Sequence, residues 1–286
     1  MDSRDVVEIL RARPASDGDG VRLLRVFGGN GPERFDPFLL LDEFGSDQPL
    51  DYQGGFPPHP HRGFETVTYM LHGKMEHRDH LGNVGLLSDG GVQWMTAGRG
   101  IVHSEMPKQT QGLMQGFQLW VNLPASKKMK PASYSDIAAA ELPLYPLANA
   151  SIKLIAGEIS VAGKLLKGYF NIADTRVIYG DIRLEPESSL TVNLDSDLNA
   201  LVYAFVGNPC VGTSAFRMET KSLARLGSGD SITFSNPGSQ PASLLLLAGQ
   251  PLKEPVVQYG PFVMNTRDEI DLAIQQYQAG TLTGAG

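Results

Sequence analysis

The feature that most constrains this chain is a long series of short β-rich segments with almost no helical periodicity. Between Val21 and Trp120, runs such as VRLLRVF, FLLLDEF, FETVTYML and FQLWVNL alternate with turns rich in Gly, Pro and Asp. Short strands at this spacing are typical of antiparallel sandwiches and small barrels. A parallel α/β sheet would need crossover helices, which this stretch lacks. We therefore predict an all-β first half.

A second β-rich series follows a stretch of different composition. Residues 124–146 are rich in Lys, Ser, Ala and Pro, which indicates a connection between domains. A chain of 286 residues also exceeds the usual size of one hydrophobic core. We expect an N-terminal domain over residues 1–130 and a C-terminal domain over residues 131–286. The spacing of strands is similar in the two halves, without a close residue-level repeat.

One amphipathic helix is predicted near the C-terminus, over about residues 266–279. Thr266 and Glu269 have the spacing of a capping box. An apolar helical face follows before Gly280, made by Ile270, Ala273, Ile274 and Tyr277. We expect this face to pack against the flank of a β-domain.

Charge and cysteine content exclude several classes of function. Asp and Glu outnumber Lys and Arg by 31 to 24, so direct nucleic-acid binding is disfavoured. The densest basic stretch, residues 127–130, is predicted to be a solvated loop. Cys210 is the only cysteine, which favours the cytoplasm over an oxidising compartment. The first ten residues do not resemble a signal peptide, and no apolar run is long enough to span a membrane.

Histidine placement indicates one site in the first half. All six histidines lie between residues 59 and 103. In His59-Pro60-His61 the proline favours extended backbone, so both imidazoles leave the same face of a strand. The same spacing recurs in His103-Ser104-Glu105. On facing strands these two pairs form a cage of four ligands, His59, His61, His103 and Glu105, for a divalent first-row metal such as Fe, Mn, Ni, Cu or Zn.

The alternatives differ for each residue. One His-x-His pair alone is more often an ordinary surface or core pair, and the second pair shifts the balance toward a metal. Glu65, four residues after His61, is either a fifth ligand or, as we favour, a partner that orients an imidazole. His72 and His80 are interpreted as part of a solvated hairpin. His77 and Asp79 belong either to that hairpin or to a cavity mouth.

Three longer motifs resemble the pirin family. They are DPFLLLDE at residues 36–43, GFPPHPHRGFE at residues 55–65 and QWMTAGRGIVHSE at residues 93–105. Further similar stretches occur at residues 118–124, 254–257 and 260–265. The resemblance spans nearly the whole chain. It implies two cupin-type antiparallel β-barrel domains, a bicupin, with a metal in the N-terminal barrel.

The resemblance also implies a cofactor and an activity. Its ligand set is His59, His61, His103 and Glu105, with Fe(II) as the expected ion and Glu65 off the metal. Several pirin-like proteins are quercetin 2,3-dioxygenases, so we expect a flavonol-like aromatic substrate and assign Glu105 as the group that takes the 3-hydroxyl proton. The alternatives are a non-enzymatic iron-dependent redox sensor that binds a regulatory protein partner, and a cupin with a structural ion.

Overall fold

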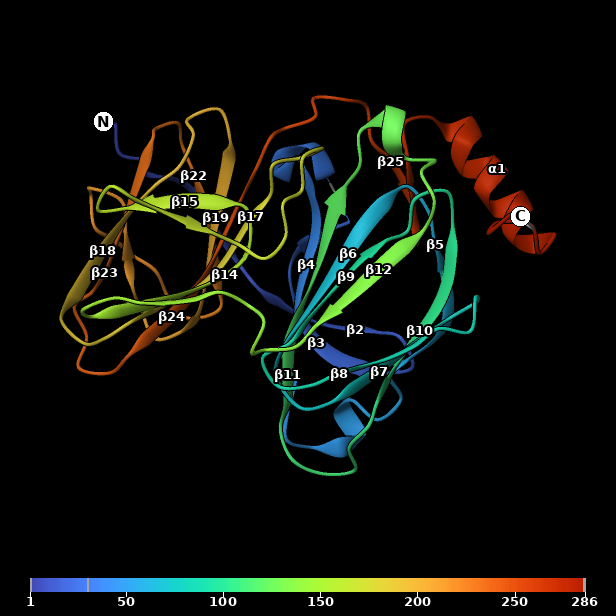
Figure 1. Ribbon diagram of the computed structural model, residues 1–286, viewed down its shortest axis with the longest axis horizontal. Coiled ribbons are helices and arrows are strands. Elements are labelled where there is room, and N and C mark those ends of the chain that lie inside the picture. Colours follow the sequence, from blue (N-terminus) through green and yellow to red (C-terminus); the bar gives the residue numbers. More distant parts are fainter. Residues whose placement is uncertain (1, 30, 285–286) are drawn as a thin grey trace. The chain divides into compact units, whose positions relative to one another are not determined.

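The computed structural model describes residues 2–29 and 31–284, which form two compact units. The histidine domain comprises Arg13–Ala140 and the residues from Leu252 onward. The companion domain comprises the residues up to Ala12 and Glu141–Pro251. Both are built from antiparallel sheets, so the predicted bicupin fold with a C-terminal helix is confirmed (Figure 1). None of the described helices is long and apolar enough to cross a membrane.

Besides a small two-stranded sheet over residues 257–264, two main sheets make up the histidine domain (Figure 1). The larger has the order β12-β9-β6-β11-β4-β3-β2 and the smaller β5-β10-β7-β8. The strands of the larger sheet are β2 (Arg13–Asp17), β3 (Val21–Gly28), β4 (Phe38–Ser46), β6 (Phe64–His72), β9 (Val92–Thr96), β11 (Met114–Asn122) and β12 (Ser133–Ile137). Those of the smaller sheet are β5 (Phe56–His61), β7 (Met75–Asp79), β8 (Val84–Leu87) and β10 (Ile101–Pro107).

The composition of β5 explains its position at the edge of the smaller sheet. Its sequence, FPPHPH, contains three prolines, which have no N–H to donate to a neighbouring strand. Proline is therefore tolerated only where one side of the strand is unpaired. The edge position accepts these prolines while β10 supplies all the pairing that β5 has in the described structure. This strand carries two of the predicted site histidines.

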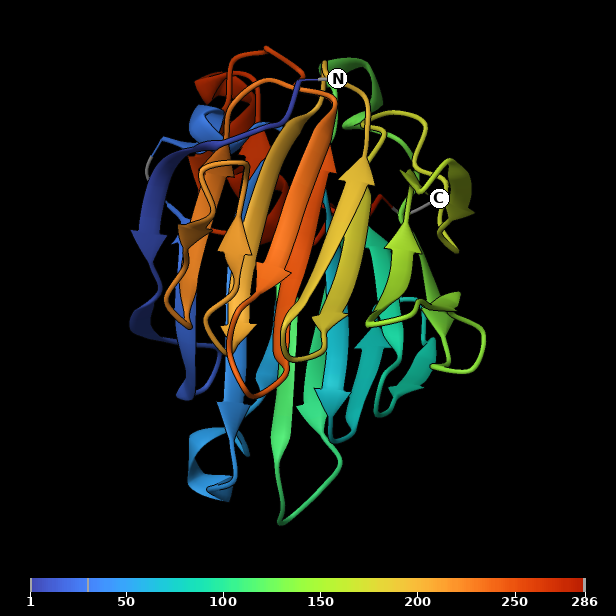
Figure 2. The ribbon, with the colours of Figure 1, turned by 90° about the vertical axis from the view of Figure 1, so that its left-hand side faces the viewer.

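The companion domain also has two sheets, of seven and six strands. Figure 2 shows strands of this domain side by side. The larger sheet has the order β1-β22-β19-β24-β17-β14-β13. These strands are β1 (Val6–Arg11), β13 (Leu144–Pro146), β14 (Ala150–Ala156), β17 (Ile178–Leu184), β19 (Asn199–Val206), β22 (Ser222–Leu226) and β24 (Ala242–Gly249). The second sheet contains β15 (Glu158–Val161), β16 (Lys164–Lys167), β18 (Ser188–Asn193), β20 (Cys210–Val211), β21 (Phe216–Arg217) and β23 (Ser231–Asn236). Aliphatic side chains from both sheets form one core, as alternating strands require.

The compact units differ from the contiguous halves 1–130 and 131–286 because each end of the chain joins the other half. Near the N-terminus, β1 pairs with β22. Near the C-terminus, Val263 N donates to Arg62 O, and Lys128 Nζ donates to Val263 O. These long-range hydrogen bonds leave no trace in local composition, so a boundary placed by composition misses them.

The C-terminal helix α1 (Arg267–Gln278) belongs to the histidine domain. The predicted capping box is present, with Thr266 Oγ1 accepting from Glu269 N. Ile270 and Ala273 are buried against Phe262 and Met264, which lie on β26 (Phe262–Met264), the partner of β25 (Val257–Tyr259). The predicted packing of the helix against a β-domain is therefore confirmed.

Candidate metal centre

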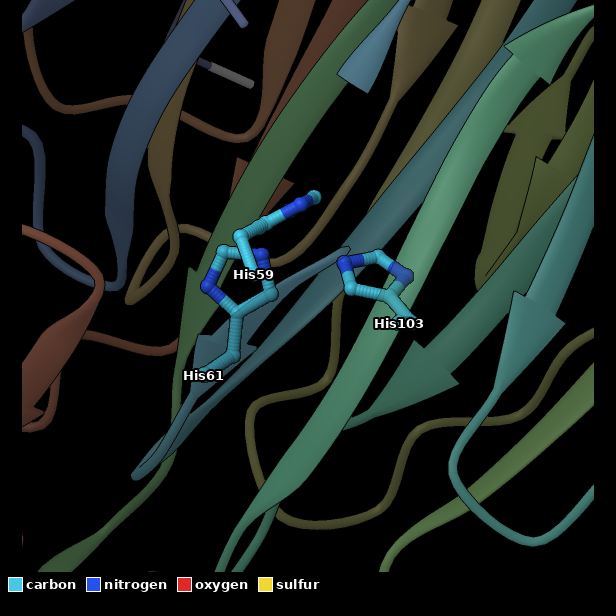
Figure 3. Close-up of side chains that lie close together, drawn as sticks. All are labelled: His59, His61 and His103. Atoms are coloured by element: carbon cyan, nitrogen blue, oxygen red, sulfur yellow. The ribbon is translucent and has the colours of Figure 1, made fainter. Parts of the chain in front are cut away.

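Strand pairing brings three of the predicted residues together. In the antiparallel pair β5 and β10, His103 lies opposite His59, and Ile101 lies opposite His61. Figure 3 shows the three imidazoles turned toward one another, and one nitrogen from each lies within 4.8 Å of the others. The two segments are neighbouring antiparallel strands of one sheet. Their assignment as metal ligands stays a prediction.

Burial keeps two of these imidazoles neutral. The exposed fraction is 3% for His61 and 1% for His103. Burial, together with the neighbouring imidazoles, holds the pKa of His61 and of His103 well below the ordinary histidine value. A neutral imidazole keeps a nitrogen lone pair, which is what a metal ion requires.

The hydrogen bonds of the cluster fit a metal ion. His59 Nδ1 lies 2.8 Å from Pro57 O and can only donate to that carbonyl, so His59 Nε2 carries the lone pair. His61 Nδ1 and His103 Nε2 are buried and have no hydrogen-bond partner among the described residues. Buried polar nitrogens without partners are rare because they cost free energy. A bound cation would use these lone pairs, so the donor set is compatible with the metal.

Glu105 lies near the three histidines but outside their nitrogen cluster. The pairing of β10 with β5 shifts register between His103 and Glu105, which changes the relation of the two side chains to β5. Glu105 Oε1 accepts a hydrogen bond from Thr68 Oγ1 at 2.9 Å. Its side chain lines the same cavity as His59 and His61. The predicted fourth ligand is thus placed at the site, and its coordination stays a prediction.

His77 has a role that the sequence did not predict. It is buried, and its Nε2 lies 2.8 Å from Nδ1 of His103. If His103 Nδ1 donates to His77, Nε2 of His103 is left as the lone pair toward the cluster. The spacing of two residues between Met75 and His77 was a usable sequence signal for an inward-facing histidine, because alternate side chains of a strand share a face. Both side chains are buried on β7.

The remaining candidates are not part of the nitrogen cluster. His72 and His80 are exposed, and Asp79 accepts hydrogen bonds from Leu81 N and Asn83 N within its own turn. The interpretation of this segment as a solvated hairpin is therefore confirmed, except for the buried His77.

Glu65 does not orient an imidazole. It accepts hydrogen bonds from Trp94 Nε1 at 3.1 Å and Thr96 Oγ1 at 2.7 Å, and it pairs with Lys130. The expectation assumed that Glu65 continues the strand of His61. Gly63, with a φ of 93°, interrupts the extended backbone between β5 and β6. The alternation of side-chain direction in β5 therefore does not continue into β6.

A cavity of about 670 Å³ opens onto the candidate site. His59, His61 and Glu105 form one part of its wall. Apolar side chains form much of the rest, and they include Leu23, Leu40, Phe44, Phe56, Met75 and Trp120. A concave, largely apolar site with a few convergent polar groups is typical of small-molecule binding. Phe56 lies on β5, the strand that also carries His59 and His61.

Comparison with known proteins is consistent with this geometry. The pirin family profile matches residues 20–121, and the profile of the pirin C-terminal cupin domain matches residues 179–283. A Pseudomonas aeruginosa protein named provisionally as a quercetin 2,3-dioxygenase is 50% identical over 281 residues, 98% of each chain. Human pirin is 39% identical over 279 residues, which cover 96% of this chain and 93% of pirin.

A solved structure is also similar to this chain over its whole length. The crystal structure of a quercetin 2,3-dioxygenase from Acinetobacter baumannii superposes with a TM-score of 0.90 at 32% identity, covering 100% of both chains. Profile matches in both halves and full-length relatives well above 30% identity agree. The chain therefore belongs to the pirin family.

Proposed function

We propose that this protein is a metal-dependent dioxygenase that cleaves flavonols such as quercetin with dioxygen. The observation that carries the proposal is the cluster of His59, His61 and His103 on the wall of a cavity of about 670 Å³. The relatives named as quercetin 2,3-dioxygenases support an oxidoreductase.

The donor set favours a first-row metal, and we propose iron. His59, His61 and His103 supply nitrogen, and Glu105 supplies carboxylate oxygen, a combination that suits Fe, Mn, Ni, Cu and Zn. When bound, iron would polarise the 3-oxygen of a flavonol and supply the redox chemistry that dioxygen requires. The adjoining cavity would leave room for a substrate at a bound ion, which a closed structural site lacks.

The protein residues have separate roles in the proposed reaction. Glu105 takes the proton of the flavonol 3-hydroxyl, and Thr68 holds Oε1 of this carboxylate in place. Apolar side chains such as Phe56 and Trp120 bind the aromatic rings and exclude water. The ring is then opened by one molecule of dioxygen, both of whose atoms enter the organic product while one ring carbon leaves as carbon monoxide.

The decisive experiment measures carbon monoxide release and oxygen uptake with quercetin. Iron-reconstituted protein is compared with metal-stripped protein, with His103→Ala and with His72→Ala. His72 is exposed and remote from the cluster, so His72→Ala controls for loss of a histidine. We expect turnover in the reconstituted protein and in His72→Ala, and none in the other two.

Two outcomes would contradict the proposal. Absence of turnover with iron fully bound would favour the iron-dependent regulator over the dioxygenase. Turnover that persists in His103→Ala, with iron content unchanged, would place the metal elsewhere.

A further inference from the structure

A row of polar side chains crosses the cavity-facing side of the larger sheet in the histidine domain. Strand pairing sets Arg25 opposite Asp42, Asp42 opposite Gln118, and Gln118 opposite Thr68. The four residues lie on four successive strands, β3, β4, β11 and β6, and all four line the cavity. Side chains opposite one another in neighbouring strands share a face of the sheet. The row is therefore continuous.

One end of the row lies at the candidate metal centre. Thr68 Oγ1 lies 2.9 Å from Glu105 Oε1 and 2.6 Å from Gln118 Oε1. One hydroxyl proton cannot serve both, and the amide of Gln118 can be turned so that its NH₂ donates to Thr68. Thr68 then donates to Glu105. The first contact of the row is thus with the proposed proton acceptor.

The other end of the row is Arg25. Its Nε donates to Asp42 Oδ1 at 3.0 Å, and its Nη2 donates to Asp42 Oδ2 at 2.7 Å and to Asp17 Oδ2 at 3.0 Å. Nη1 makes no hydrogen bond to a described residue. The two Asp42 bonds hold the guanidinium at a fixed angle and raise the pKa of Arg25, so it stays charged. Arg25 therefore presents oriented, unused donors beside two carboxylates.

The length of the row matches an extended aromatic ligand. Neighbouring strands are about 4.8 Å apart, so the backbones of Arg25 and Thr68 are separated by roughly 14 Å. The long side chain of Arg25 shortens the gap between the polar groups at the two ends. Apolar groups such as Leu40 and Trp120 line the same cavity. A ligand with one polar end at Glu105 and a second at Arg25 would contact both the polar row and the apolar wall.

We propose that Arg25, with Asp17 and Asp42 beside it, recognises neighbouring hydroxyl groups on an aromatic ring of the substrate. The inference rests on the proposed function and specifies its substrate as an ortho-dihydroxylated aromatic compound. A phenolic hydroxyl oxygen accepts from Arg25 Nη1, and a phenolic proton is donated to a carboxylate oxygen. Two adjacent hydroxyls match this alternation of donor and acceptor.

Stability alone does not require a charged pair at this place. Ion pairs taken out of water are often no more stable than apolar side chains of similar volume. Asp42 has an exposed fraction of 4%, and the neighbouring cavity residues Leu23, Leu40 and Phe44 are apolar. Recognition of a polar ligand group accounts for a charged pair in this apolar wall.

The test measures binding of two flavonols to iron-loaded protein without dioxygen, by quenching of tryptophan fluorescence. Quercetin has two neighbouring hydroxyls on its pendant ring, and galangin is the same flavonol with none. A pair of charge-assisted hydrogen bonds predicts that the Kd of quercetin is about tenfold lower than that of galangin. Turnover of both compounds is measured in parallel.

Two variants change the subsite, and a third is the matched control. Arg25→Lys keeps the charge beside Asp42 but loses the planar fork. Asp17→Asn changes a carboxylate whose side chain is 55% exposed, so the fold is retained even if Arg25→Lys does not fold. Arg22→Lys is the control, because Arg22 lies on the same strand, is exposed and does not line the cavity.

We expect Arg25→Lys and Asp17→Asn each to reduce the preference for quercetin. In Arg25→Lys the Kd values of quercetin and galangin should differ by no more than about twofold. Arg22→Lys should retain the preference of the unmodified protein. Equal Kd values in the unmodified protein, or an unchanged preference in the folded variants, overturn the subsite. Equal Kd values with normal turnover overturn it and leave the dioxygenase. Discrimination in binding without turnover overturns the dioxygenase and leaves the subsite.

Discussion

Nε2 of His77 lies 2.8 Å from Nδ1 of His103 in the buried interior of the histidine domain. The two residues are on neighbouring strands, β7 and β10, where His77 lies opposite Glu105. His77 thus contacts one candidate ligand and is paired in register with another. A residue in this position fixes the ring orientation and tautomer of the ligand that it supports.

We predict that His77→Phe weakens iron binding by roughly 10- to 100-fold, because His103 loses the partner that orients its ring. The measurement is a competition titration against a chelator. His72→Phe is the control on an exposed histidine. His77→Gln, which keeps a hydrogen-bonding group, should recover part of the affinity. An unchanged iron affinity in folded His77→Phe would contradict the positioning role.

Thr68 should affect turnover because it holds Oε1 of Glu105. Thr68→Val keeps the shape of the side chain and removes the hydroxyl. We predict that kcat/KM for quercetin falls roughly tenfold, since the carboxylate is no longer held in position. Thr66→Val is the matched control, because Thr66 is buried on the same strand but does not line the cavity. An equal loss in both variants would point to a general packing effect.

The capping box of α1 should contribute measurably to stability. Thr266 Oγ1 accepts from Glu269 N, and Glu269 Oε2 accepts from Thr266 N. We predict that Thr266→Ala lowers the free energy of unfolding by about 1 kcal/mol, as loss of such caps does elsewhere. Chemical denaturation measures the change. Thr281→Ala, at an exposed threonine beyond the helix, should change stability by less than about half that amount.

Local patterns predicted the strands of the larger sheet well. The runs at residues 21–27, 38–44 and 64–71 correspond to β3, β4 and β6. The strands that carry the site, β5 and β10, were not among the β-rich runs, because prolines and polar residues replace β-branched ones there. Their histidines revealed them through the period of two, which is a purely local property.

Contacts set by strand register lie beyond such local reasoning. The contact of His77 with His103 and that of Thr68 with Glu105 join residues 26 and 37 positions apart. Their approach depends on how β7 pairs with β10 and on how the two sheets pack, which no local spacing specifies. Counting alternate residues also predicts side-chain direction only within one strand. The count fails for Glu65, which lies beyond the turn at Gly63.

Lys128 was expected in a solvated loop and is instead buried, with an exposed fraction of 1%. Its Nζ donates to Gly63 O at 2.8 Å, Asn122 Oδ1 at 2.6 Å and Val263 O at 3.0 Å. Val263 belongs to the C-terminal segment, so this ammonium joins distant parts of the histidine domain. A basic run that contains one buried lysine is indistinguishable in sequence from a solvated one.

Burial lowers the pKa of Lys128 from its ordinary value of 10.5 to about 8. Between these values the unfolded chain holds the proton that the folded chain has lost, so the free energy of unfolding rises with pH. Integrated over the window from pH 8 to 10.5, the gain is roughly 3 kcal/mol. Below pH 8 both states are protonated, and the contribution is constant. Chemical denaturation across this pH range measures the slope.

Lys128→Met isolates this contribution, because methionine has similar length and no charge. The variant is expected to be less stable, since three carbonyl oxygens lose their donor. Its stability should lack the rise with pH that Lys128 provides. Subtracting the two curves removes other groups, such as Tyr179, whose raised pKa acts in the opposite direction. Lys127→Met, at the exposed neighbour, should retain the slope of the unmodified protein. Parallel curves for the unmodified protein and Lys128→Met would mean that Lys128 stays protonated across the window, with its three acceptors outweighing the effect of burial.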